Sequence, residues 1–320
     1  MQRPFMRSKL FVPGARAALF DKALRSAADA VSFDLEDAVA QEAKAQARLL
    51  VGAALREAPA RALRSLLIVR VNAPDTPAFE ADLKAVVQPG LAFINLPKVQ
   101  SAADVLRAVS TLERVESENG VTRPIELLVT IETPRALLRA FEIASAHPRV
   151  TGLQLGLGDL FEPLAIDRRD AANLHAAMFA LRLAAGAAGV FACDGAYAEL
   201  QDLPGFRAEA EMAQRLGFIG KSCIHLSQVA TANEVFGHPN HSNDLAAALR
   251  IVEAARAARG QAVFVVDGKM IDAPYLQRAQ AVVAPQRAAA PGHRACPAER
   301  HQPAADLLRR HRLWRNGADA

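Results

Sequence analysis

Charged residues stand where several apolar runs of the sequence end. Asp34-Leu35-Glu36-Asp37 closes one run, Arg70 closes a second and Lys98 follows a third. Glu132 and Asp159 follow two further runs. Because parallel strands present their carboxyl ends at one edge of a sheet or barrel, we expect these side chains to gather there.

The carboxylates in this set indicate a metal site. Without a cluster of His or Cys ligands, they favour a hard cation, Mg²⁺ with Mn²⁺ as a second choice, over zinc. Glu132 and Asp159 end strands that are adjacent in the chain, so the sequence predicts them as the metal ligands. Mg²⁺ usually takes one or two carboxylates and leaves its other positions to water and substrate. The alternative is that both acids are salt-bridged to Arg70 or Lys98.

Three cations can likewise have either a functional role or a purely structural one. Arg70 ends an apolar strand and needs a partner if it is buried. Its fork of donors could stabilise a developing oxyanion, but a structural ion pair with Glu36 or Asp37 accounts for it equally well. Arg16 and Lys22, near the start of the first helix, could grip phosphates, although such charges usually lie on a solvated helix face.

Eight short apolar runs alternate with amphipathic stretches, which is typical of a (β/α)₈ barrel. A doubly wound open sheet would give a similar local pattern, and the number of strands favours the TIM barrel. The predicted strands are Lys9–Val12, Ala30–Asp34, Leu66–Val71, Ala92–Leu96, Glu126–Ile131, Gly152–Leu157, Val190–Cys193 and Phe218–Cys223. The predicted helices between them include Ala17–Ala27, Lys44–Arg56, Ala102–Glu116, Arg135–Ala146, Ala171–Ala188 and Arg207–Arg215.

Three regions follow from this pattern. Residues 1–240 are expected to form the barrel, and residues 241–284 a C-terminal helical lid extension with helices at Asn243–Arg259 and Pro274–Val283. Residues 285–320 are rich in Pro, Ala, Arg and His and lose the apolar periodicity, which predicts a disordered basic tail.

Composition excludes several classes of protein. The 320 residues are 51% hydrophobic and 22% charged, so a sizeable core can be buried. The formal net charge of +4 is inflated by the basic tail and does not favour nucleic-acid binding. The three cysteines form no Cys-x-x-Cys pair and no disulfide framework. With no signal-like start and no membrane-spanning apolar run, a soluble cytoplasmic protein is expected.

Seven motifs in order and spacing resemble those of the citrate lyase beta subunit family, which includes malyl-CoA and citramalyl-CoA lyases within the aldolase/citrate lyase superfamily. The resemblance covers about residues 7 to 284. The motifs are Ser8-Lys9-Leu10-Phe11-Val12-Pro13-Gly14, Phe33-Asp34-Leu35-Glu36-Asp37-Ala38-Val39, Arg70-Val71-Asn72, Leu96-Pro97-Lys98, Ile131-Glu132-Thr133, Gly217-Phe218-Ile219-Gly220-Lys221 and Lys269-Met270-Ile271-Asp272.

The resemblance implies a (β/α)₈ barrel, Mg²⁺ and a homotrimer or hexamer. It implies that Glu132 and Asp159 bind the metal and that Arg70 is the active-site arginine. Glu36 and Asp37 would stand beside the metal site rather than bind the ion, with Asp37 near a water on the metal.

The resemblance also implies residues for the rest of the substrate. Phe11, Arg16 and Lys22 match positions that contact the CoA moiety in malyl-CoA lyases. Asp272 matches an acid on a C-terminal lid that can enter a neighbouring subunit's site. The chain departs from the family at Leu226, where a proline is common, and before Asp159, where many relatives carry an acid; both departures bear on which substrate is used.

The reaction implied is cleavage or formation of a carbon–carbon bond in a 3-hydroxyacyl thioester such as citryl-, malyl- or citramalyl-CoA, giving a 2-oxo acid and an acetyl thioester. Arg70 would stabilise the thioester oxyanion and Asp272 would transfer the proton at the enolate carbon. One alternative is a citrate lyase subunit that acts on an acyl-carrier-protein thioester. Another is an aldolase for free 2-oxo acids, which would have no use for Arg16 and Lys22. A third is a barrel that has lost catalysis and senses acyl-CoA.

Overall fold

The computed structural model describes residues 4–57, 65–237, 242–258 and 262–289. The chain divides into two compact units, residues 1–240 and 241–320, and each is described by itself. None of the described helices is long and apolar enough to cross a membrane.

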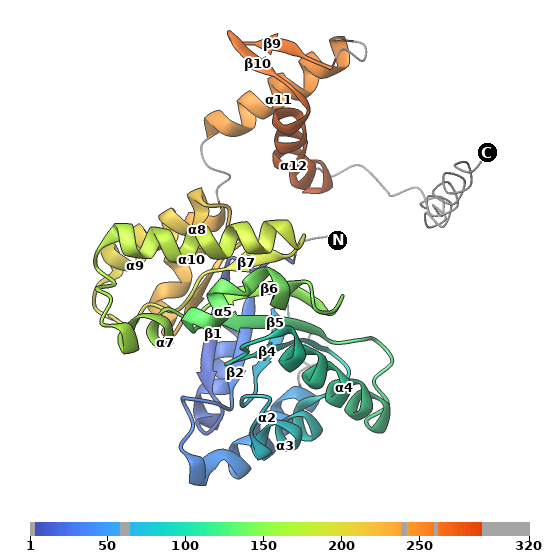
Figure 1. Ribbon diagram of the computed structural model, residues 1–320, viewed down its shortest axis with the longest axis vertical. Helices are drawn as coiled ribbons and strands as arrows, with labels where there is room; N and C mark the ends of the chain where they lie inside the picture. The colour runs from blue at the N-terminus through green and yellow to red at the C-terminus, as the bar shows by residue number, and fades with distance from the viewer. Residues whose placement is uncertain (1–3, 58–64, 238–241, 259–261, 290–320) are drawn as a thin grey trace, which may run out of the picture. The chain divides into compact units, whose positions relative to one another are not determined.

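The first unit is a parallel barrel, as the sequence predicts (Figure 1). Its sheet has the order β7-β6-β5-β4-β3-β2-β1-β8, so each strand lies beside its neighbour in the chain and β8 returns to β1. The strands are β1 Ser8–Pro13, β2 Ala30–Asp34, β3 Leu66–Arg70, β4 Leu91–Leu96, β5 Glu126–Ile131, β6 Val150–Leu155, β7 Phe191–Cys193 and β8 Lys221–Cys223. Each of the eight predicted apolar runs overlaps one of these strands.

Backbone hydrogen bonds between β7, β8 and the residues that flank them close the barrel. They join residues 192–194 to residues 219–222, with donor–acceptor distances from 2.8 to 3.0 Å. Lys221 is fully buried at this seam. Its Nζ lies 2.6 Å from Asp194 Oδ2 and 2.5 Å from Glu209 Oε1. A few backbone hydrogen bonds therefore hold the seam together, and the buried charge of Lys221 is compensated there by Asp194 and Glu209.

Helices follow the strands in the order expected of βα units. The stretch predicted as one helix from Arg135 to Ala146 is two short helices, because Arg139 adopts φ −112° and ψ 13° between them. The α-helices of the first unit are α1 Phe20–Leu24, α2 Lys44–Glu57, α3 Pro77–Val86, α4 Ala102–Glu118, α5 Pro134–Leu138, α6 Ala140–Ala144, α7 Leu157–Phe161, α8 Ala171–Ala187, α9 Leu203–Arg215 and α10 Leu226–Gly237.

Successive strand residues point alternately to the helices and to the barrel axis. Helix-facing residues such as Leu10, Val31 and Val69 belong to the main hydrophobic core. Axis-facing residues form a separate apolar cluster towards the amino ends of the strands, which includes Ala30, Ile68, Phe93, Leu128 and Phe191. This inner cluster supports the polar groups that lie closer to the carboxyl ends.

A polar layer follows the inner apolar cluster along the strands. Lys9 of β1 is fully buried there. Its Nζ donates to Asn95 Oδ1 at 2.6 Å and also to Gln154 Oε1. The Asn95 amide in turn donates to Thr130 Oγ1 at 2.8 Å. The layer thus ties β1, β4, β5 and β6 together beneath the strand ends.

The second unit contains α11 Ser242–Ala257, a hairpin of β9 Phe264–Val266 and β10 Lys269–Ile271, and α12 Ala273–Ala289. Asp267 and Gly268 link the strands with φ values of 50° and 76°, as a two-residue hairpin turn requires. Ala248, Ala279 and Val283 form a small core. The helix α12 runs to Ala289, so residues 285–289 are helical where the sequence predicts the start of a disordered tail. The rest of that prediction, residues 290–320, lies outside the described residues.

Candidate active site

Arg70 and Asp34 form the centre of a charged cluster at the carboxyl ends of β2 and β3. The two residues are register partners, so their side chains leave the barrel wall side by side. Arg70 Nε donates to Asp34 Oδ1 at 2.8 Å and Nη2 donates to Oδ2 at 2.7 Å. Burial raises the pKa of Asp34, but the hydrogen bonds and charge of Arg70 outweigh it, so that pKa lies below its usual value.

Two further acids and one further cation extend the cluster. Arg70 Nη1 lies 3.1 Å from Glu36 Oε2 and 3.6 Å from Asp37 Oδ2. Lys98 Nζ lies 3.0 Å from Glu36 Oε1 and 3.0 Å from Asp37 Oδ1. The structural ion pair considered for Arg70 is therefore present, but its two-point partner is Asp34, which the sequence did not single out. Arg70 still keeps part of its side chain accessible, with 15% exposed.

Glu132 directly follows β5 and is almost completely buried, with 2% exposed. Its Oε1 accepts a hydrogen bond of 2.6 Å from the backbone N–H of Lys98. Burial raises the pKa of Glu132 to about 8, and the charges of Glu36 and Asp159 add to the shift. A buried carboxyl surrounded by other carboxylates is a site that a cation would stabilise in its ionised form.

Gly156, at the end of β6, makes room for Glu132. A Cβ at position 156 would lie 2.5 Å from Glu132 Cβ and 2.7 Å from its Oε2. Real side chains do not approach so closely, so any larger residue would displace the carboxyl. The glycine that begins Gly156-Leu157-Gly158-Asp159 is thus part of how Glu132 is positioned.

Asp159 lies in the first turn of α7, on the loop that follows β6. Its side chain is exposed, and its charge is close enough to raise the pKa of Glu132. In the part of the chain that the structure describes, no ion pair joins Glu132 or Asp159 to Arg70 or Lys98. The alternative in which both acids are merely salt-bridged to those cations is therefore not what the structure shows.

The charges of this end of the barrel suit a divalent cation. Arg70 and Lys98 pair with three of the acids named above, Asp34, Glu36 and Asp37, and leave Glu132 and Asp159 without an ion-pair partner among the described residues. The available donors are oxygen atoms, which Mg²⁺ prefers. Among the described residues no three His, Cys, Asp or Glu side chains are grouped as metal ligands. A pair of carboxylates fits an ion that leaves most positions to water and substrate.

Phe11 lies at the same end of the barrel. Its ring centre is 5.0 Å from the Arg70 guanidinium carbon and 4.1 Å from Lys9 Nζ. Arg16 and Lys22 are both exposed, and neither has an ion-pair partner among the described residues. The structure thus brings Phe11 to Arg70 and leaves the two outer cations available to a ligand.

Asp272 belongs to the second unit, between β10 and α12. Its Oδ1 is buried, and no described group donates a hydrogen bond to it. A buried acid oxygen without a donor calls for an explanation, which a functional role can supply.

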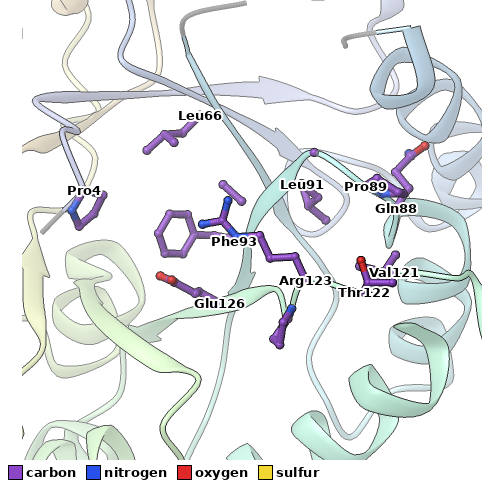
Figure 2. Close-up of a pocket in the computed structure, with 13 residues that line it drawn as sticks. Pro4, Leu66, Gln88, Pro89, Leu91, Phe93, Val121, Thr122, Arg123 and Glu126 are labelled. Atoms are coloured by element: carbon purple, nitrogen blue, oxygen red, sulfur yellow. The ribbon is translucent and has the colours of Figure 1, made fainter. Parts of the chain in front are cut away.

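A cavity of about 420 Å³ lies at the opposite end of the barrel (Figure 2). It is lined by residues at or before the amino ends of strands, among them Leu66, Leu91, Arg123 and Glu126. Enzymes of this fold place their chemistry at the carboxyl ends of the strands. The charged cluster, and not this cavity, is therefore the candidate active site.

Comparison with known proteins shows the family to which the chain belongs. The family model of HpcH/HpaI aldolase/citrate lyase matches residues 7–226. Citrate lyase subunit beta of Haemophilus influenzae is 37% identical over 283 residues, covering 87% of this chain and 95% of that protein. A (3S)-malyl-CoA thioesterase of Cereibacter sphaeroides is 39% identical over 289 residues, covering 90% and 96%.

A solved structure extends the comparison to three dimensions. Protein CitE from Mycobacterium tuberculosis, in complex with magnesium, acetoacetate and coenzyme A, is 32% identical and superposes with a TM-score of 0.66, covering 87% of this chain and 96% of its own. The family model and the curated relatives cover most of the chain, and the barrel agrees with the solved structure, so the chain is a lyase of the HpcH/HpaI aldolase/citrate lyase family.

Proposed function

We propose that the chain is a Mg²⁺-dependent carbon–carbon lyase for a 3-hydroxyacyl thioester that carries a carboxylate beside the hydroxyl. The observation that carries the proposal is that the charge of Asp159 acts on the buried Glu132, that neither acid has an ion-pair partner among the described residues, and that a fixed Arg70 lies near Glu132. The products would be a 2-oxo acid and an acetyl thioester, and condensation would run through the same transition state.

Glu132 and Asp159 would hold the ion. Mg²⁺ bound there would act as a Lewis acid towards the hydroxy-acid end of the substrate and ease loss of the hydroxyl proton. Complexes of the similar CitE protein contain magnesium, which supports the choice of metal.

Arg70 would stabilise the other product. When the hydroxyl proton is lost and the carbon–carbon bond breaks, the bonding electrons become an enolate whose charge falls on the thioester oxygen. The two hydrogen bonds to Asp34 fix the plane of the Arg70 guanidinium, so its remaining N–H groups are oriented before substrate binds. Removal of a comparable preorganised donor lowers rates by about 10²–10³.

Asp272 would exchange the proton at the enolate carbon. Its buried, unpartnered oxygen and its match to the family motif support this role. Because the matching acid of the family can enter a neighbouring subunit, we expect a homotrimer or hexamer.

Phe11, Arg16 and Lys22 would bind the thioester carrier. The aromatic ring lies beside Arg70, and the exposed cations would pair with phosphates. The coenzyme A in the similar CitE complex supports CoA as the carrier. Similarity to citrate lyase beta subunits leaves an acyl-carrier-protein thioester as the second candidate.

Similarity to a malyl-CoA thioesterase favours one more candidate, hydrolysis of the thioester. The substrates would overlap, and the products would differ. Hydrolysis would release a hydroxy acid and free CoA, whereas the lyase would release a 2-oxo acid and acetyl-CoA.

The test is incubation of the purified chain with malyl-, citramalyl- and citryl-CoA, with Mg²⁺ and with EDTA. Metal-dependent release of acetyl-CoA and the matching 2-oxo acid is expected from at least one of them. Release of free CoA as the first product would show that the chain acts as a thioesterase and not as a lyase. Folded, Mg²⁺-binding protein that leaves all three esters intact would favour the carrier-protein substrate or a free 2-oxo acid aldolase.

A further inference from the structure

Lys98 has an unusual backbone. It follows β4 with φ 56°, in the left-handed region that residues with side chains rarely adopt. A residue held in this conformation is usually fixed by its surroundings, and such residues concentrate at functional sites. Lys98 is also tied to the site by two different parts of the same residue.

The backbone of Lys98 is directed at Glu132. Its N–H donates to Glu132 Oε1 at 2.6 Å, on a carboxyl that is otherwise nearly enclosed. Gly156 leaves space for the other oxygen. The left-handed turn at Lys98 therefore sets where the Glu132 carboxylate points.

The side chain of Lys98 contacts two other acids, Asp37 at 3.0 Å and the buried Glu36. Its Nζ lies 3.0 Å from Glu36 Oε1, while Arg70 Nη1 lies 3.1 Å from Glu36 Oε2. The two cations thus share one buried carboxylate, one oxygen each. Without the Lys98 amine, Glu36 would be compensated mainly by Arg70, and the guanidinium would be drawn towards it.

We propose that Lys98 is a positioning residue with two separable actions: its left-handed backbone aims Glu132, and its amine balances Arg70 through Glu36. This inference rests on the proposed function, in which Glu132 binds Mg²⁺ and Arg70 stabilises the thioester oxygen. The backbone action governs metal affinity, and the amine governs turnover.

Three variants separate the actions. Lys98→Gly removes the amine but accepts φ 56° readily, so kcat should fall about tenfold or more while the Mg²⁺ Kd stays within about threefold. Lys98→Val lacks the amine and is β-branched, which opposes a positive φ. Its Mg²⁺ Kd should rise about tenfold or more above that of Lys98→Gly. Lys98→Arg keeps a cation near Glu36 and should recover most of the lost kcat.

The measurements are Mg²⁺ titration calorimetry and steady-state kinetics with the thioester that the wild type cleaves. Lys84→Met, on the exposed face of α3, is the matched control for loss of an amine. Far-UV circular dichroism establishes that each variant is folded; if Lys98→Val is not, Lys98→Leu replaces it.

Two outcomes would overturn the proposal in its separate parts. Wild-type kcat in Lys98→Gly would remove the role of the amine, and equal Mg²⁺ affinity in the glycine and valine variants would remove the role of the backbone. A wild-type protein that binds no Mg²⁺ would instead refute the proposed function. Binding without cleavage of any ester would refute the assigned reaction and leave the calorimetric test of the backbone valid.

Discussion

Arg70 and Asp34 meet through two parallel hydrogen bonds across neighbouring strands, Nε to Oδ1 at 2.8 Å and Nη2 to Oδ2 at 2.7 Å. The pair fixes the Arg70 guanidinium at the end of the barrel. A guanidinium that was free to rotate would lose its orientation towards a substrate. A bidentate pair of this kind fixes both position and plane.

Replacing Asp34 by Ala should therefore weaken both fold and catalysis. The variant leaves a largely buried cation with less compensation, which should lower the free energy of unfolding by about 3 kcal/mol. Urea unfolding at pH 7 measures this effect. Asp167→Ala, which breaks the exposed pair with Arg169, is the control and should leave the midpoint almost unchanged. Equal midpoints for the two variants would contradict the structural importance of the Asp34 pair.

Gly156→Ala should weaken Mg²⁺ binding without unfolding the barrel. The added Cβ would stand 2.5 Å from Glu132 Cβ, so the carboxyl must move and the Mg²⁺ Kd should rise about tenfold or more. Gly158→Ala is a close control, because a Cβ there would meet nothing within 4 Å. Calorimetry that finds the same Kd for both variants would argue against Glu132 as a ligand.

Lys9 should make stability depend on pH above neutrality. Burial lowers the pKa of the Lys9 amine from 10.5 to about 7, so in this range the unfolded chain holds a proton that the folded chain lacks. The free energy of unfolding should therefore rise between pH 7 and 10, by up to about 1.4 kcal/mol per pH unit. The comparison is denaturant unfolding of wild type against Lys9→Met over this range. A constant difference between the two proteins would show that the amine stays protonated in the barrel.

Asp272→Ala should retain Mg²⁺ affinity and lose turnover, since the proposed role of Asp272 is to move a proton rather than to bind the ion. Asp267→Asn provides a control in the same unit, because asparagine tolerates the positive φ of that turn. Kinetics and Mg²⁺ titration on both variants test the assignment. Full activity in Asp272→Ala would exclude Asp272 as the acid.

The strands were predictable because both faces of each one are buried. Val31 and Val69 pack against helices, whereas Ala30 and Ile68 face the barrel axis, so most of the strands read as nearly continuous apolar runs. Alternation of such runs with amphipathic stretches also fits a doubly wound open sheet, and the number of strands favoured the barrel, which the order of the strands confirms.

The charged residues at the strand ends were also visible in the sequence, and Glu36 and Asp37 were considered as partners of Arg70. Its two-point pairing with Asp34 was not. Asp34 pairs with Arg70 because β2 and β3 align these positions in register, and no local pattern reports that alignment. The contact from the Lys98 backbone to Glu132 depends on one unusual φ value. Glu132 and Asp159 as metal ligands remain a prediction for the titrations above.

The closure of the barrel has a consequence for how the chain is made. The first strand takes one neighbour from residues 30–34 and the other from residues 221–223. On the ribosome, therefore, an edge of hydrogen-bonding groups stays unpaired until more than two thirds of the chain has emerged. Pairing across so long a separation is slow, and an open edge can recruit other chains. We expect newly synthesised chains to be most vulnerable to aggregation before the eighth strand arrives.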